Sequence, residues 1–349
     1  MLDKIPCKSV RVPGNSLFPT DFIDNALQSP AMRSVDVHQH LWPEAVLRVL
    51  EKRQAAPKAR WHHDRWHIDL PGEPGFQIDP ADHDPHTRAS GLTVDKALVA
   101  LSSPVGLEAL PARDALAAVA AWQEAATRLP DELGWWAATP AVLQSDGEAE
   151  IATEAISAGA AGVCLPADRL ATPRDAQAAL PLLAPVADAG APVFVHPGPA
   201  NGTTTEPAWW SPATRYVAQQ HAAWHSFHHV IRSELPTLRA IFALLAGLAP
   251  LHAERTDSRS QTQSGDAALA DPLTFYDTSS YGARAVRAMA TAVGIGQLVH
   301  GTDYPVGKQD QKDPVEEAFG EGFAQLVRTA APHRALGYTW VPAVRGLSA

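Results

Sequence analysis

The chain has 349 residues, of which 46% are hydrophobic and 19% charged, so it can bury a large core and is not disordered as a whole. Its formal net charge of −10 gives no basic surface for nucleic acid or for an anionic membrane. Two cysteines, Cys7 and Cys164, make no disulfide framework, and no segment has the ~20 apolar residues of a membrane span. We therefore expect a cytoplasmic protein without nucleic-acid or membrane partners, and this composition is compatible with a homodimer.

Residues 1–32 are expected to form an irregular N-terminal arm, and residues 33–349 a single domain. In that domain short apolar runs alternate with longer Ala- and Leu-rich stretches, which is typical of repeated βα units. The expected strands are 34–38, 96–102, 134–139, 162–165, 193–196, 239–245, 275–278 and 297–301. The expected helices are 111–128, 146–158, 173–189, 211–235, 283–294 and 314–331.

One connection, at about residues 43–84, is too long to be simple and is rich in Trp, His, Pro and Gly. It follows the first strand. Because long loops often serve as lids over functional sites, we expect a helix and then a small β-rich insertion above the active-site mouth.

Eight parallel strands in series predict an α/β protein, most economically closed into a (β/α)8 barrel of the TIM type. An open doubly wound sheet is the competing interpretation. Such a sheet normally has a glycine-rich phosphate loop after its first strand. Here His-Gln-His-Leu-Trp-Pro follows instead, which also disfavours a dinucleotide-dependent oxidoreductase.

Four residues at strand ends suggest a metal site. His38 and His40 are two apart, so on one strand they point to the same face, while Gln39 points away. His196 ends the run Val193–Val195, and Asp303 follows the last strand. Three imidazoles and a carboxylate suit one divalent ion, and we expect Zn2+, whose bound water ionises near neutral pH.

Each element of this pattern also has an ordinary structural explanation. A His-X-His triplet occurs by chance, a His-Pro pair is common in turns, and Asp303 can cap a helix or close an Asx turn. The order of the four residues and their position at strand ends nevertheless agree with one site at the carboxyl face of a barrel.

The segments Val35-Asp36-Val37-His38-Gln39-His40, Phe194-Val195-His196-Pro197 and Gly301-Thr302-Asp303-Tyr304-Pro305 resemble the amidohydrolase superfamily. More narrowly, they are similar to its amidohydrolase-related branch, which includes aminocarboxymuconate-semialdehyde decarboxylase. The resemblance covers about residues 34–310. It implies a distorted (β/α)8 barrel that holds one metal ion by His38, His40, His196 and Asp303.

One position departs from this branch. The family usually has a histidine in its sixth strand, within an Ala-His-Leu-Gly-Gly-like run, and here Leu244 takes that place. The resemblance implies a proton-transfer role for that histidine, which leucine cannot perform. His252 follows the same strand and is the candidate to replace it. His221, His225, His228 and His229 share a helix face that runs away from the site, so we expect them to pack or to contact another subunit.

The sequence thus predicts a metal-dependent hydrolase or decarboxylase (lyase) acting on a small carboxylated or cyclic substrate through a metal-bound water. Asp303 and His252 are the expected catalytic residues. Trp42, Trp209 and Asp277 are expected to line the substrate pocket. The alternative is a catalytically impaired metal-binding barrel with a binding or regulatory role, because of Leu244.

Overall fold

The structure is a computed structural model, and it describes residues 32–101, 103–107, 110–140, 145–200, 202, 205–260, 264–307 and 312–337. The N-terminal arm expected at residues 1–32 lies almost wholly outside these residues, and its last residue, Met32, lies just before the first strand. The fold below is that of the described residues of the unit Arg33–Ala349.

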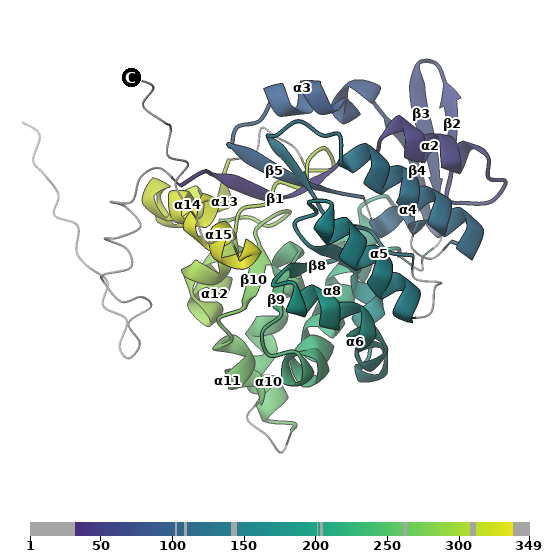
Figure 1. The fold of residues 1–349 in the computed structure, drawn as a ribbon. Helices are drawn as coiled ribbons and strands as arrows, with labels where there is room; N and C mark the ends of the chain where they lie inside the picture. Colours follow the sequence, from purple (N-terminus) through teal and green to yellow (C-terminus); the bar gives the residue numbers. More distant parts are fainter. Residues whose placement is uncertain are drawn as a thin grey trace, which may run out of the picture. The chain divides into compact units, whose positions relative to one another are not determined.

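Eight short parallel strands form the centre of this unit (Figure 1). They belong to two sheets, one in the order β1-β5-β6 and the other in the order β11-β10-β9-β8-β7. The strands are almost fully buried, as expected for a parallel sheet covered on both faces by other elements. Their bounds are β1 Val35–His40, β5 Lys96–Ala100, β6 Leu133–Trp135, β7 Val163–Pro166, β8 Pro192–His196, β9 Arg239–Phe242, β10 Thr274–Asp277 and β11 Leu298–Val299.

Isolated backbone contacts join the edges of the two sheets. Ala137, just after β6, forms a parallel bridge with Val163 of β7. At the other edge, the Val37 amide of β1 donates to the carbonyl of His300, at 2.9 Å, and Gln39 forms a parallel bridge with Tyr304. The strands therefore follow one another in chain order, and the segment after β11 returns to β1. The expected α/β fold is confirmed.

Helices follow most strands and pack apolar faces against them. The helix α6 shows why they begin where they do: the Thr172 hydroxyl caps it by accepting from the Asp175 amide, and Pro173 takes the first helical position. These helices include α4 Ala112–Ala126, α5 Ser145–Ser157, α6 Pro173–Asp188, α8 Arg215–Ser226, α12 Ala283–Val293, α13 Pro314–Phe319, α14 Glu321–Arg328 and α15 Ala330–Leu336.

Two of the expected helices are divided. The stretch expected at 314–331 breaks at Gly320, whose φ of 90° no helix allows, and so it forms α13 and α14. The stretch expected at 211–235 is a short α7 (Trp210–Ala213), then α8, then a π-helical turn at Phe227–Ile231 and α9 (Arg232–Glu234). Hydrophobic periodicity predicted where these helices lie, but not where their hydrogen bonding changes.

The long connection after β1 contains a helix and a separate antiparallel sheet. Helix α2 (Glu44–Glu51) comes first, and the sheet has the order β2-β3-β4, with β2 Lys58–His62, β3 Arg65–Leu70 and β4 Glu73–Ile78. The apolar side of β3, with Trp66, Ile68 and Leu70, is buried. Figure 1 shows this sheet at one end of the unit, beside α2 and α4.

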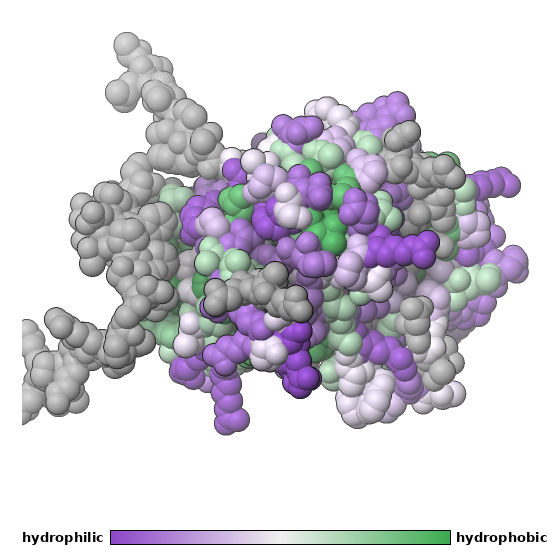
Figure 2. All heavy atoms as spheres, turned by 90° about the horizontal axis from the view of Figure 1, so that it is seen from below, coloured by the Kyte–Doolittle hydropathy of each residue, from purple (hydrophilic) through white to green (hydrophobic). Residues whose placement is uncertain are grey.

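Within the described residues, no helix is both long and apolar enough to cross a membrane. Figure 2 shows one face of the molecule, on which hydrophilic side chains are interspersed with smaller apolar areas.

Candidate metal centre

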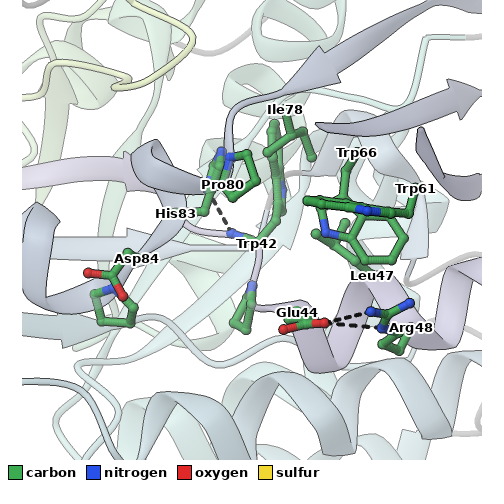
Figure 3. Close-up of a pocket in the computed structure, with 12 residues that line it drawn as sticks. Trp42, Glu44, Leu47, Arg48, Trp61, Trp66, Ile78, Pro80, His83 and Asp84 are labelled. Atoms are coloured by element: carbon green, nitrogen blue, oxygen red, sulfur yellow. Dashed lines mark hydrogen bonds and ion pairs between the residues drawn. The ribbon is translucent and has the colours of Figure 1, made fainter. Parts of the chain in front are cut away.

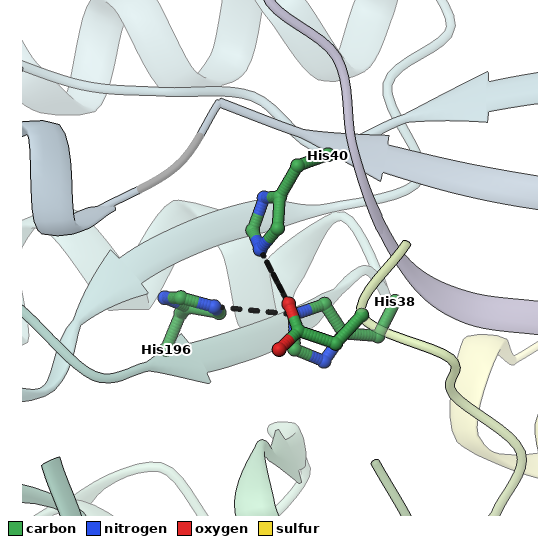
Figure 4. Close-up of side chains that lie close together, drawn as sticks. His38, His40 and His196 are labelled. Atoms are coloured by element: carbon green, nitrogen blue, oxygen red, sulfur yellow. Dashed lines mark hydrogen bonds and ion pairs between the residues drawn. The ribbon is translucent and has the colours of Figure 1, made fainter. Parts of the chain in front are cut away.

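The structure brings together the four residues that the sequence singled out as metal ligands. His38 and His40 lie on one face of β1, His196 ends β8, and Asp303 lies in the loop after β11. One ligand atom from each can be chosen so that all four lie within 4.8 Å of one another, and all four residues are buried. Figure 4 shows the three imidazole rings turned toward one another.

The distances between these atoms match those of ligands around one ion. Nε2 of His38 lies 3.1 Å from Nε2 of His40 and 3.1 Å from Nε2 of His196. The Asp303 Oδ1 lies 3.2 Å from Nε2 of His38 and 3.0 Å from Nε2 of His40. Ligands about 2.1 Å from a metal ion lie about 3.0 Å apart at right angles and about 3.4 Å apart at tetrahedral angles. The four residues present therefore fit a divalent cation.

The second ring nitrogen of each histidine faces an acceptor. His38 Nδ1 lies 2.6 Å from the Asp277 carboxylate, His40 Nδ1 lies 3.3 Å from the Ala100 carbonyl, and His196 Nδ1 lies 2.8 Å from the Pro197 carbonyl. A carbonyl can only accept, so these contacts place the proton on Nδ1 of His40 and His196. The Nε2 lone pairs then face the centre of the cluster, as ligation requires.

Asp277 is held in place by residues that follow β10. Its Oδ2 accepts from the Ser279 hydroxyl at 2.6 Å, and its Oδ1 accepts from the Ser279 amide at 2.9 Å. Gly301 is essential to this arrangement, because a Cβ there would overlap Oδ1 of Asp277. Asp277 is fully buried, so its role is to orient His38 and to support its basicity.

A second buried carboxylate, that of Asp36, fixes the loop that contains Asp303. Its Oδ1 accepts from the amides of His38 and Thr302, at 3.0 and 3.1 Å, and its Oδ2 accepts from the Thr302 hydroxyl at 2.6 Å. The Asp303 amide also donates to the His38 carbonyl at 2.8 Å. Asp303 itself has a φ of 58°, a conformation that aspartate tolerates better than most residues.

In the cluster, burial and the neighbouring charges shift the pKa values of His38 and Asp303 in opposite directions. Burial alone would lower the pKa of His38, but the carboxylates of Asp277 and Asp303 raise this pKa to about 10. Burial, with His40 and His38 next to it, holds the pKa of His196 well below its usual range. Burial would raise the pKa of the Asp303 carboxyl, yet His38 and His40 hold it well below the ordinary value. The cluster thus contains an ionised carboxylate and a neutral imidazole, which are metal-binding forms.

A cavity of about 610 Å³ opens beside the cluster. Three of the four expected metal ligands line it, together with tyrosine, serine and threonine side chains and an apolar wall that includes Leu244. The lining residues are His40, Pro104, His196, Pro197, Pro212, Ala213, Tyr216, Val217, Leu244, Ser280, Tyr281, Thr302, Asp303, Val306 and Gly307. The volume suits a small molecule.

Glu73 of the inserted sheet contacts Tyr216, a residue of the cavity wall. The Tyr216 hydroxyl, on α8 at the cavity wall, donates to Oε1 and Oε2 of Glu73, at 2.7 and 2.9 Å. The amide of Ala200 also donates to Oε1, at 3.2 Å. Burial raises the pKa of Glu73, and burial followed by the charge of Glu73 raises that of Tyr216. The Tyr216 hydroxyl therefore keeps its proton and donates it to Glu73 in a short hydrogen bond at the cavity wall.

The other residues expected in the site lie elsewhere. Trp42 stacks on His83 and lines a second cavity of about 450 Å³ between α2 and the inserted sheet (Figure 3). Trp209 is exposed and lies against Trp210. His252 is exposed at the end of the segment Leu244–His252, with its ring against His221. Asp277 contacts His38, one of the expected metal ligands, and does not line the cavity.

The position of His252 follows from the chain's path after β9. The strand ends at Phe242, not at residue 245 as the apolar pattern predicts. Leu244 to Leu248 all have φ between 48° and 61°, a left-handed turn that only glycine adopts at no cost. This turn directs the rest of the segment along α8.

Sequence reasoning missed Asp36, Glu73, Tyr216 and Tyr281. Asp36 is two residues before His38, so the two side chains lie on the same face of the strand. This spacing could have identified Asp36 from the sequence. Glu73 and Tyr216 are 143 residues apart, and nothing in either segment indicates the other.

No protein-family model matches the chain, and no curated protein sequence matches it. Several solved structures do match the chain. The IDCase of Metarhizium anisopliae is 17% identical, with a TM-score of 0.68, and the match covers 87% of this chain and 97% of that one. An amidohydrolase II is 16% identical, with a TM-score of 0.68 and coverage of 87% and 100%.

A third match is a 5-carboxyvanillate decarboxylase from Novosphingobium aromaticivorans, solved with manganese and 4-hydroxy-3-methoxy-5-nitrobenzoic acid. It is 14% identical, with a TM-score of 0.56, and the match covers 74% of this chain and 80% of that one. The resemblance inferred from the motifs is thus confirmed at the level of the fold. The chain has the fold that these amidohydrolase and decarboxylase structures share.

Proposed function

We propose that the chain is a metal-dependent enzyme of the amidohydrolase superfamily, built as a (β/α)8 barrel, that decarboxylates or hydrolyses a small cyclic molecule. The observation that carries this proposal is the four-residue cluster beside a cavity of about 610 Å³. The bridges that join the edges of the two parallel sheets support the barrel. A closed barrel places the ends of its strands, and so these ligands, around one axis.

Three imidazole nitrogens and one carboxylate favour Zn2+, and manganese, as in the decarboxylase above, is the second choice. When bound, such an ion stabilises negative charge that develops on a substrate oxygen and acidifies a coordinated water. The chain supplies the remaining requirements. Asp277, Ala100 and Pro197 fix the three rings, and all four residues of the cluster are buried.

Of the two reactions, we favour decarboxylation of an aromatic carboxylate, because one of the three matched structures above is, by name, a 5-carboxyvanillate decarboxylase. In this reaction the C–C bond to the carboxylate breaks, its electron pair stays on the ring carbon, and a proton must form the new C–H bond. Asp303 faces the cavity. Because it is ionised, it must first take a proton from water before it can pass that proton to the ring carbon. Tyr216 can hold a ring hydroxyl. In hydrolysis Asp303 would instead accept a proton from the attacking water.

A metal-loaded sample tested on a panel of aromatic carboxylic acids, lactones and amides decides between these reactions. We expect release of CO2 from at least one carboxylic acid, dependent on the metal and abolished by Asp303→Asn. If a lactone or amide is hydrolysed and no acid releases CO2, the reaction is hydrolysis and not decarboxylation. A protein that binds no divalent ion would contradict both.

The second candidate is a metal-binding barrel without turnover, and Leu244 is the observation that favours it. Its side chain lines the cavity where the related family has a histidine. Metal binding at full stoichiometry, with slow release of a bound carboxylic acid and no product, would support this candidate.

A further inference from the structure

A second group of imidazoles lies outside the metal centre. His221 and His225 are one turn apart on α8, and His252 ends the segment Leu244–His252 (η6), which packs along the same helix. The ring centroids of His221 and His225 are 4.9 Å apart, and those of His221 and His252 are 4.8 Å apart. In the metal centre the three pairs of histidine rings are 5.0, 4.9 and 4.8 Å apart. The neighbouring rings of the second group therefore have the spacing of those in the first.

We propose that His221, His225 and His252 bind a second divalent transition-metal ion, independently of the first. Imidazole nitrogen is a preferred ligand of Zn2+, Ni2+ and Cu2+, and histidines four residues apart on a helix share one face. His252 is exposed, and His221 and His225 are partly exposed, so an ion can enter from solvent. Within the described residues only the first cluster has its ligand atoms all within 4.8 Å, so binding here turns the rings inward. Exposed side chains make such rotations within nanoseconds.

The protonation of these rings suits metal binding. Burial, and then the neighbouring His252, lowers the pKa of His221. Burial, with His221 and His252 next, lowers the pKa of His225 to about 4. Both rings are therefore neutral at pH 7, and an ion need not displace a proton from them. The Gly247 backbone forms a hydrogen bond with His221, much as backbone carbonyls orient His40 and His196 in the first cluster.

Other histidines of the chain are arranged differently. His228 lies 3.8 Å from the Asp271 carboxylate, and its side chain is almost fully buried. His62, His63 and His67 lie on the hairpin of β2 and β3, where the centroid distances from His62 are 3.8 and 5.8 Å. These spacings do not match those of the metal centre, and the hairpin histidines serve as a control.

The proposed ion would join two elements that form the walls of the main cavity. Tyr216 lies five residues before His221 on α8, and Leu244 begins the segment that His252 ends. Binding would therefore hold these walls together at a point outside the cavity.

Zinc titration of the metal-free full chain, followed by equilibrium dialysis and metal analysis, tests the proposal. We expect two equivalents for the unmodified chain and one for His221→Ala with His225→Ala. His252→Ala should weaken the second equivalent about tenfold or more. The matched control is His229→Ala, an exposed histidine on the same helical stretch, which should keep two equivalents.

A second measurement separates this site from the first. With His38→Ala and His40→Ala, Cu2+ should still bind at one equivalent, and its electron paramagnetic resonance spectrum should show coupling to several nitrogens. The proposal is overturned if His221→Ala with His225→Ala binds as much zinc as His229→Ala does. It is also overturned if His62→Ala with His63→Ala removes the second equivalent instead.

Discussion

The carboxylate of Asp277 lies 2.6 Å from Nδ1 of His38, and both side chains are completely buried. This contact connects the end of β10 to the first strand and fixes the ring whose Nε2 lies between His40 and His196. A carboxylate in this position makes the imidazole a better ligand, because it stabilises positive charge on the ring.

We therefore expect Asp277→Asn to weaken metal binding about 10- to 100-fold while the fold is retained. Competition with a chelator of known affinity, monitored by metal analysis, measures the change. Ser279→Ala is the matched comparison, because it removes one hydrogen bond to Asp277 and keeps the carboxylate. Equal affinities in Asp277→Asn and the unmodified chain would show that Asp277 does not support His38.

Asp36→Asn should lower the free energy of unfolding by about 1–3 kcal/mol. The Asp36 carboxylate accepts four hydrogen bonds, from His38, Gln39 and twice from Thr302, and an amide group would turn two of its own N–H donors toward other donors. Urea denaturation measures this difference. Thr302→Ala removes one of these bonds and should cost less. If Thr302→Ala lowers the free energy of unfolding more than Asp36→Asn does, the stabilisation comes from the loop around Thr302 and not from the Asp36 carboxylate.

His83 makes the stability of the inserted region depend on pH. Burial, followed by Arg88 and His40, lowers the pKa of His83 to about 3, and its Nδ1 accepts from the Trp42 amide at 3.1 Å (Figure 3). The folded state thus prefers the neutral ring. The stability it contributes is present above the unfolded pKa of about 6.5 and is lost as pH falls from there toward 3.

Below pH 6 the free energy of unfolding should therefore fall by about 1.4 kcal/mol per pH unit through this group. His83→Asn keeps an acceptor near Trp42 without a titrating ring, so urea denaturation between pH 4 and 7 should show a smaller slope. The exposed His62→Asn is the control. Identical slopes in His83→Asn and His62→Asn would exclude His83 as the cause.

Leu244→His should raise the turnover of a responsive aromatic carboxylic acid by about 100-fold, if the cavity lacks only a proton-transfer group. The φ of 53° at Leu244 is one that histidine tolerates, so the change should not disturb the backbone. Turnover at equal metal loading measures the gain. Leu248→His is the matched control, because Leu248 shares this left-handed conformation with a φ of 61°. A gain in both variants would point to a nonspecific effect of an added imidazole.

The four expected metal ligands could be predicted because each depends on a local rule. The alternation of side chains along a strand places His38 beside His40, and strand ends place His196 and Asp303 at the same edge. These rules need only the segments themselves, and so the predicted residues and the observed cluster agree.

The positions of Trp42 and His252 depend on turns that follow strands, and no local rule covered them. Trp42 stacks on His83 and lines the cavity beside the inserted sheet, and its ring lies 6.5 Å from that of His40 without lining the cavity beside the cluster. His252 follows five residues of left-handed backbone, and their sequence, Leu-Leu-Ala-Gly-Leu, does not predict that conformation. The contact of Tyr216 with Glu73 arises only when the inserted sheet meets α8, which is a property of the assembled fold.

That contact also limits how the chain can be shortened. Glu73 is the acceptor for both the Tyr216 hydroxyl and the Ala200 amide. A truncated variant without the three-stranded insertion would take this acceptor away from both donors, at a cost of about 1–3 kcal/mol for each donor that finds no new partner. The small sheet therefore holds Tyr216, a residue of the cavity wall, in place, and trimming it would require new acceptors for those two groups.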